Sequence, residues 1–268
     1  MDLQFALANA FFELPDEEKR EVVFIPGETQ FGYRIPEEIH GTGIKENIEL
    51  LNVHKFIPGT DYPRHAFVRQ HERTISSFQK LVHDAVISKL LILFAIMLEL
   101  PEDNFTAMHR FEKPSDEHLR YVSASDLLNS LQIRTPEEEW KWVKYVPGAI
   151  VCNAADLLSM MTKGYIKSSI HRVVRPPADQ NHLARLGVFY FLRPTDDVRI
   201  RIRLSYSPVL GRAGLWDLEV DEKARGEDAP TCGEFVLARM KNFVPSRIMG
   251  SDEKATTRVG NLEVVNKY

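Results

Sequence analysis

The chain has 268 residues, of which 44% are hydrophobic and 27% are charged, and its formal net charge is -4. A chain of this length can bury a full core as one large domain. The acidic balance argues against a nucleic-acid-binding protein, because such proteins usually carry a basic surplus on the binding face. Cys152 and Cys232 are too few for a disulfide framework or a thiolate zinc site.

The N-terminal segment carries Asp2 and Glu13 and lacks a cationic start, so it does not have the pattern of a signal peptide. The longest apolar run, Leu90–Leu98, is far shorter than the roughly 20 residues that a membrane-spanning helix needs. We therefore expect a cytoplasmic protein, a monomer that binds neither a membrane nor nucleic acid.

The first half of the chain is predicted to be mainly helical. Residues 1–13 predict a helix, 16–62 an irregular segment, and 67–100 a long helix with apolar residues at helical spacing. Residues 90–98 are apolar all round, which predicts a helix end that is buried on every side. Pro101 ends this helix.

The second half has short stretches that are rich in β-branched and aromatic residues and separated by turn clusters. Such a pattern indicates a β-sandwich or a barrel. The predicted strands are Leu131–Arg134, Trp140–Tyr145, Ala149–Asn153, Ser169–Val174, Leu186–Leu192 and Val198–Leu204. A helix near Thr231–Asn242 is expected to pack outside them. The architecture would then be an N-terminal helical layer that supports a β-barrel.

His171 and Arg185 are the candidate chemical residues in this half. They lie on two predicted strands joined by a long connection, which we interpret as a hairpin. Since side chains alternate along a strand, an imidazole and a guanidinium could point into one barrel cavity. A histidine can bind iron, and a guanidinium can bind a carboxylate through two parallel hydrogen bonds. Taken alone, a strand histidine is more often a structural residue.

Three stretches change this interpretation. Residues Pro147–Asp156, Gly164–Val173 and Arg185–Phe191 follow one another in this order. They resemble the C-terminal half of the isopenicillin-N-synthase-like Fe(II)/2-oxoglutarate-dependent oxygenases. The sequence of His171–Gln180 is most similar to the filamentous-fungal branch of that family. Phe11–Lys19, Gly32–Arg34 and Leu98–Phe105 agree with the resemblance.

The resemblance implies a mainly β fold with α-helices, a double-stranded β-helix (jelly-roll) barrel with an N-terminal helical layer. It implies Fe(II) in a His/Asp/His site, 2-oxoglutarate as cosubstrate, and ascorbate as a supporting reductant. The reaction would oxidise a small organic molecule, as in secondary metabolism. We expect one domain, 1–268, with a helical support region at 1–121, an incomplete jelly-roll core at 122–208, and a C-terminal extension with a helix at 209–268.

The resemblance also assigns individual residues. His171 corresponds to the distal iron-binding histidine, and Arg185 to the arginine that pairs with the far carboxylate of 2-oxoglutarate. Gly187 stands where the family usually has a serine, so one hydroxyl contact to the cosubstrate is absent. Tyr121, within Leu119-Arg120-Tyr121, matches a family position that often helps to hold the cosubstrate.

The family's first ligand pair, His-x-Asp, is not found, because none of the nine histidines has Asp or Glu two positions later. Val122–Ser130 occupies its place, which indicates that a strand-bearing segment is missing. The nearest substitute ligand is His118, in a stretch that predicts a polar loop. His71 and His83 are predicted to lie on the solvated face of the long helix.

Three hypotheses therefore stay open. The chain is a 2-oxoglutarate-dependent oxygenase, or it is a catalytically inactive relative, which includes a binding protein, a truncated product or a faulty gene model. The third hypothesis is a metal-free barrel enzyme for a non-oxidative step, in which His171 acts as an acid or base. The sequence names neither the substrate nor the outcome among hydroxylation, desaturation and cyclisation.

Overall fold

The computed structural model describes residues 1–25, 27–36, 38–39, 44–45, 48–124, 131–174, 185–200, 207–215, 229–249, 256–259 and 262–265. Most of the stretch where the first iron ligands were expected, 125–130, and the loop 175–184 lie outside these residues.

The helices follow the predicted order. The N-terminal helix is confirmed as α1 (Asp2–Phe12) and is followed by the short α2 (Asp16–Lys19). The long helical segment is confirmed in four parts: α3 (Ala66–Gln70), α4 (Glu72–Val82), the π-helix η1 (His83–Ile87) and α5 (Ser88–Met97). Beyond it lie η2 (Thr106–Met108), α6 (Asp156–Met161), α7 (Pro208–Arg212) and α9 (Cys232–Met249).

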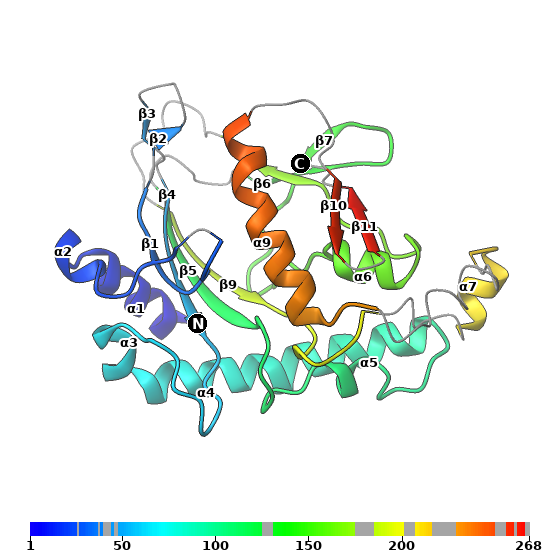
Figure 1. Cartoon of the computed structure of the whole chain (residues 1–268), viewed down its shortest axis with the longest axis horizontal. Helices are drawn as coiled ribbons and strands as arrows, with labels where there is room; N and C mark the ends of the chain where they lie inside the picture. The colour runs from blue at the N-terminus through cyan, green and yellow to red at the C-terminus, as the bar shows by residue number, and fades with distance from the viewer. Residues whose placement is uncertain are drawn as a thin grey trace.

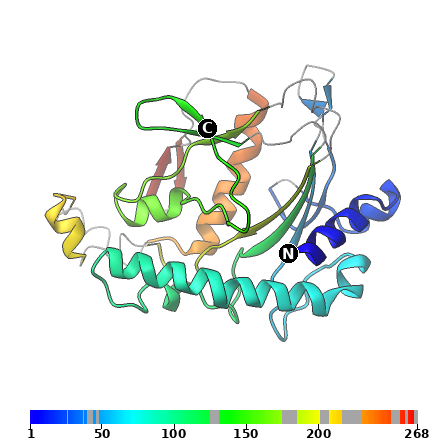
Figure 2. The same ribbon diagram turned by 180° about the vertical axis from the view of Figure 1, so that it is seen from behind.

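Figure 2 shows α4 and α5 as one long rod that runs beneath the rest of the molecule. The prediction that residues 90–98 are buried on every side was wrong. Leu91, Ala95 and Leu98 face a core cluster, whereas Ile96 and Met97 are 51% and 60% exposed. The difference arises because the rest of the chain covers this helix from one side only. No helix in the described part of the chain combines the length and the apolar character needed to cross a membrane.

The main sheet has four antiparallel strands in the order β1-β4-β5-β9. These strands are β1 (Gly32–Arg34), β4 (Ile48–His54), β5 (His118–Ala124) and β9 (Arg185–Phe191). The expectation of an irregular segment at 16–62 was therefore wrong. It failed because the polar residues of β4, such as Asn52 and His54, are buried. The boundary expected after Tyr121 falls within β5, so this sheet draws strands from both sides of it.

A second sheet has three antiparallel strands in the order β7-β6-β8: β7 (Trp140–Trp142), β6 (Leu131–Arg134) and β8 (His171–Val173). The predicted hairpin of the His171 and Arg185 strands was wrong, because β8 pairs with β6 whereas β9 pairs with β5. Residues 149–153 form no strand. Two small ribbons complete the described part: β2 (Glu38–Ile39) with β3 (Ile44–Lys45), and β10 (Thr256–Val259) with β11 (Leu262–Val265).

The main core lies between the four-stranded sheet and the N-terminal helices. Figure 1 shows α1 against one side of this sheet, with the second sheet and α9 on the other side. Apolar side chains of α1, α3 and α4 pack on apolar side chains of β1, β4 and β5. Together these residues form one buried cluster: Leu7, Ala8, Phe11, Tyr33, Leu51, Val53, Val68, Ile75, Leu119 and Tyr121. This helical layer fixes the sheet that carries Arg185.

Candidate functional site

The register of the four-stranded sheet decides which side chains share a face. Because side chains alternate along a strand, every second side chain of these strands points away from the core that contains α1. We call the side of the sheet that carries these side chains the inner face. It consists of Gly32, Arg34, Ile48, Leu50, Asn52, His54, His118, Arg120, Val122, Ala124, Arg185, Gly187, Phe189 and Phe191.

Arg185 and Gly187 both lie on the inner face, at the start of β9, opposite Ala124 and Val122. Arg185 has no hydrogen-bond or ion-pair partner among the described residues. The ring of Phe189 leans back over Gly187, so a Cβ at position 187 would lie 2.5 Å from Phe189 Cε2. The family's usual serine would therefore not fit here unless this ring moved.

Tyr121 lies on the opposite face, inside the α1 core, and is 1% exposed. Its hydroxyl donates to Gln4 Oε1 at 2.5 Å, and burial raises the pKa of its phenol. The expected contact between Tyr121 and the cosubstrate has no support in this geometry, since its side chain points away from Arg185. The short sequence match gave the position of Tyr121 in the chain, but it did not predict strand β5 or the face of the sheet on which this residue lies.

His171 lies on β8, opposite Ile133, and is exposed. Its Nδ1 is 2.9 Å from the carbonyl oxygen of Ser169, which leaves Nε2 available. Metal-binding histidines are commonly oriented by such a hydrogen bond from the other ring nitrogen. However, the described residues contain no group of three or more His, Cys, Asp or Glu side chains that could hold a metal ion. The structure places His171 and Arg185 in different sheets, with no contact that joins them.

His118, the substitute considered for the missing ligand, is fully buried at the first position of β5 and not in a polar loop. Its Nδ1 donates to the Asp116 carbonyl oxygen at 2.7 Å, and its ring stacks on Phe191 with centroids 4.8 Å apart. Burial lowers the pKa of His118 well below its usual range. It is a neutral imidazole whose Nε2 has no partner among the described residues.

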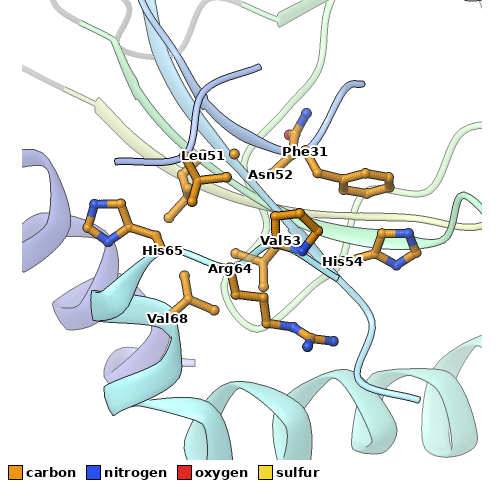
Figure 3. Close-up of a pocket in the computed structure, with 11 residues that line it drawn as sticks. Phe31, Leu51, Asn52, Val53, His54, Arg64, His65 and Val68 are labelled. Carbon is orange, nitrogen blue, oxygen red and sulfur yellow. The ribbon is translucent and has the colours of Figure 1, made fainter. Parts of the chain in front are cut away.

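His54 lies directly opposite His118 and was missed by sequence reasoning. Its ring is stacked between Phe31 and Tyr62, with both centroids at 3.8 Å, and burial lowers its pKa to about 3. Figure 3 shows the small cavity beside it, which is lined by Asn52, His54 and Arg64 among others. Its volume of about 10 Å³ suits one water molecule and excludes an organic substrate.

A second hollow, of about 390 Å³, lies between the loops that follow η2 and β9. Arg110, Lys113 and Arg199 contribute to its lining, and Lys113 forms an ion pair with Asp197 at 2.7 Å. Neither hollow includes His171 or Arg185.

A buried polar network lies behind the sheet, on the helical side. Glu117 accepts hydrogen bonds from Lys55 Nζ at 3.1 Å, from His83 Nδ1 at 2.7 Å and from the Tyr190 hydroxyl. Burial favours the neutral acid, but these donors outweigh it and lower the pKa of Glu117. The expectation that His83 is solvated was wrong, because it faces this carboxylate at the first residue of the π-helix.

Comparisons with known proteins agree with this architecture. Residues 91–194 match the 2OG-Fe(II) oxygenase superfamily. A UPF0676 protein of Schizosaccharomyces pombe is 26% identical over 235 residues, which is 72% of this chain and 70% of that protein. A 2-oxoglutarate-dependent dioxygenase of Aspergillus fumigatus is 25% identical over 222 residues, or 66% of this chain and 54% of that protein.

A solved structure of a full-length Neurospora crassa protein, in complex with α-ketoglutarate, superposes with a TM-score of 0.69 at 21% identity. The match covers 88% of this chain and 80% of that one, and it shows a shared fold. The predicted jelly-roll architecture with an N-terminal helical layer is thereby confirmed. By the match over residues 91–194, this part of the chain is similar to the 2OG-Fe(II) oxygenase superfamily, and the chain as a whole shares the fold of the solved structure.

Proposed function

We propose that the chain acts as a non-haem Fe(II)/2-oxoglutarate-dependent dioxygenase that oxidises a small organic molecule. One observation carries this proposal beyond the similarity to the superfamily. Arg185 lies on the inner face of a sheet that the helical layer holds rigidly, and no described residue neutralises it. A guanidinium in such a place suits the far carboxylate of 2-oxoglutarate, which it can bind through two parallel hydrogen bonds.

The described residues fit the cosubstrate better than the metal. His171 is the one ligand that the family motif assigns, and its Nδ1 contact with Ser169 leaves Nε2 for a metal ion. A single imidazole does not hold Fe(II) firmly, because affinity in such sites comes from several ligands positioned together. The described residues supply no second and third ligand, and we derive no catalytic step through iron.

The lack of further metal ligands among the described residues favours a second candidate function, which is a protein that binds small acids without oxidising them. Arg185 would then bind a carboxylate, and His171 would remain an exposed strand residue. The two candidates share the acid-binding sheet and differ only in whether a metal completes the site.

Anaerobic titration of 2-oxoglutarate in the presence of Fe(II), followed by an assay for succinate in air with ascorbate, separates them. Tight binding of one Fe(II) with succinate formation supports the dioxygenase. Binding of 2-oxoglutarate without succinate supports the acid-binding protein, and no binding at all refutes both.

Arg185→Lys tests the role of the arginine in the same titration. Lysine keeps the charge but cannot reproduce the two-pronged contact. We expect 2-oxoglutarate to bind at least about tenfold more weakly, a loss of about 1.4 kcal/mol. The matched control is Arg172→Lys, since Arg172 lies on the second sheet, stacked over Trp140 with its Cζ 4.0 Å from the ring centroid. Equal affinities of wild type and Arg185→Lys would remove Arg185 from the site.

A further inference from the structure

The inner face carries an unusual set of charges. Among the strand residues that form it there are three arginines, Arg34, Arg120 and Arg185, and no aspartate or glutamate. Since the chain as a whole has a net charge of -4, this face differs in sign from the rest of the protein. A buried cation whose charge the nearby carboxylates do not fully balance is costly unless a further anion accompanies it.

Arg120, the third residue of β5, is held by two contacts. Its Nε donates to Asn52 Oδ1 at 2.7 Å, and its Cζ lies 4.4 Å from the centroid of the Phe191 ring. The terminal nitrogens of its guanidinium have no acceptor among the described residues. Burial and the like charge of Arg193 lower the pKa of Arg120 to about 10, so the group stays charged at neutral pH.

The neighbouring groups offset this charge only in part, because one carboxylate, that of Asp116, attracts both Arg120 and Arg193. Asp116 forms its ion pair with Arg193, at 2.8 Å, and burial raises the pKa of its carboxyl to about 6. His54 and His118, on the same face as Arg120, are neutral at pH 7. This end of the inner face therefore keeps a surplus of positive charge.

An aromatic surface lies between Arg120 and Arg185. Phe189 is directly opposite Arg120 in the ladder, is 42% exposed, and leans over Gly187 in the direction of Arg185. The two arginines are separated by four residues along the strand pair, which is about 13 Å. One five-carbon diacid cannot span this distance, so the two guanidiniums suit two different acid groups.

We propose that Arg120 binds the carboxylate of the molecule that is oxidised, and that the apolar body of this molecule lies against Phe189. The substrate class is then a small organic acid with an apolar or aromatic body. This assignment rests on the proposed function for the statement that the acid is the oxidised substrate. The binding of an acid at Arg120 depends on neither iron nor 2-oxoglutarate.

The test compares phenylacetate with its neutral counterpart phenylacetamide, in metal-free protein, by calorimetry or ligand-detected NMR. We expect wild type to prefer the acid at least about tenfold, or about 1.4 kcal/mol. Arg120→Gln should abolish this preference, because glutamine keeps a hydrogen-bonding group but removes the charge. Arg120→Lys should retain part of it, and it provides the readout if Arg120→Gln does not fold.

The matched control is Arg172→Gln. Arg172 copies the local geometry of Arg120, since its Nε donates to Gln132 Oε1 at 2.9 Å and its guanidinium stacks on Trp140. It lies on the exposed sheet, where water screens its charge, so its replacement should leave the acid preference unchanged. Arg185→Gln tells binding of the acid at Arg120 from binding at Arg185, and it should also leave the preference for the acid in place.

Equal binding of acid and amide by wild type, or no binding of the acid at millimolar concentration, would overturn the proposal. A preference that survives Arg120→Gln, or that disappears only in Arg185→Gln, would also overturn it. Failure of the proposed function is separately visible. A chain that does not bind 2-oxoglutarate but keeps an acid preference dependent on Arg120 would lose the dioxygenase assignment and keep the acid site.

Discussion

The two sheets that carry the motif residues differ in how well the rest of the chain covers them. On the helical side of the four-stranded sheet, Leu51, Leu119 and Tyr121 are at most 1% exposed. In the three-stranded sheet, Ile133 and Val173 are 40% and 49% exposed. Since stabilisation grows with the apolar area that is removed from water, the first sheet holds the fold and the second contributes little.

This difference matters for the site. Arg185 and Arg120 project from the rigid sheet, whereas His171 projects from the exposed one. The core therefore holds the two proposed acid-binding arginines in place, and the proposed metal ligand His171 has no comparable support among the described residues. A site needs its ligands held in place to bind firmly, which explains why the geometry favours acid binding over metal binding.

The largest difference in the free energy of unfolding is expected between two substitutions, one of a buried carboxylate beside the four-stranded sheet and one of an exposed carboxylate beside the three-stranded sheet. Glu117→Gln removes the charge that balances Lys55, and breaking a buried ion pair costs about 3–5 kcal/mol. Glu138→Gln breaks the exposed pair with Arg134 in the second sheet and should cost less than about 1 kcal/mol. Urea unfolding gives both free energies of unfolding. Comparable losses would show that the Glu117 network is not a stability element.

Apolar truncation should give the next largest contrast. Leu119→Ala removes a fully buried side chain from the main core and should lower the free energy of unfolding by about 2–5 kcal/mol. Ile133→Ala, on a side chain that is 40% exposed, should change it by no more than about 0.5 kcal/mol. Thermal and urea unfolding of the pair measure this. If Ile133→Ala proves as damaging, the second sheet is covered in solution.

Buried His118 should make the free energy of unfolding depend on pH. An unfolded histidine takes up a proton near pH 6.5, whereas buried His118 stays neutral, so the unfolded state binds more protons below that pH. The free energy of unfolding therefore falls as the pH drops below about 6.5, by about 1.4 kcal/mol per pH unit for each such histidine. Asp116, whose pKa is raised to about 6, acts in the opposite direction below that pH.

We expect His118→Gln to have a shallower slope than wild type, because it lacks the one proton that the unfolded His118 takes up. Urea unfolding between about pH 7 and pH 5 gives both slopes. An unchanged slope in His118→Gln would mean that this histidine titrates normally in the folded protein.

The smallest effect on stability is expected at the uncovered residues that follow β7. Ile150 and Val151 are 64% and 63% exposed, so Ile150→Ser together with Val151→Ser should shift the free energy of unfolding by no more than about 0.5 kcal/mol for each change. Exposed apolar surface promotes association, and the double variant should therefore self-associate less than wild type. Sedimentation velocity measures this, and an unchanged distribution would contradict the expectation.

The sequence by itself determined the first helix, the long helix and the resemblance to the oxygenase family. Helical spacing in 67–100 and the ordered motifs of residues 147–191 needed only local patterns, because a helix and a strand motif repeat within a few residues. The absence of a His-x-Asp pair was also visible in the sequence alone. His171, Arg185 and Gly187 were found by motif, and the structure places the last two together on one face.

Only the tertiary structure decided which face each residue occupies. His54 and Arg120 gave no signal of a site, since neither β4 nor β5 was predicted from the sequence. Tyr121 is one residue from Arg120 yet lies on the opposite side of the sheet, inside the helical core. The physical reason is that the pairing of β4, β5 and β9, which are far apart in the sequence, fixes the register, and a shift of one residue would exchange the two faces.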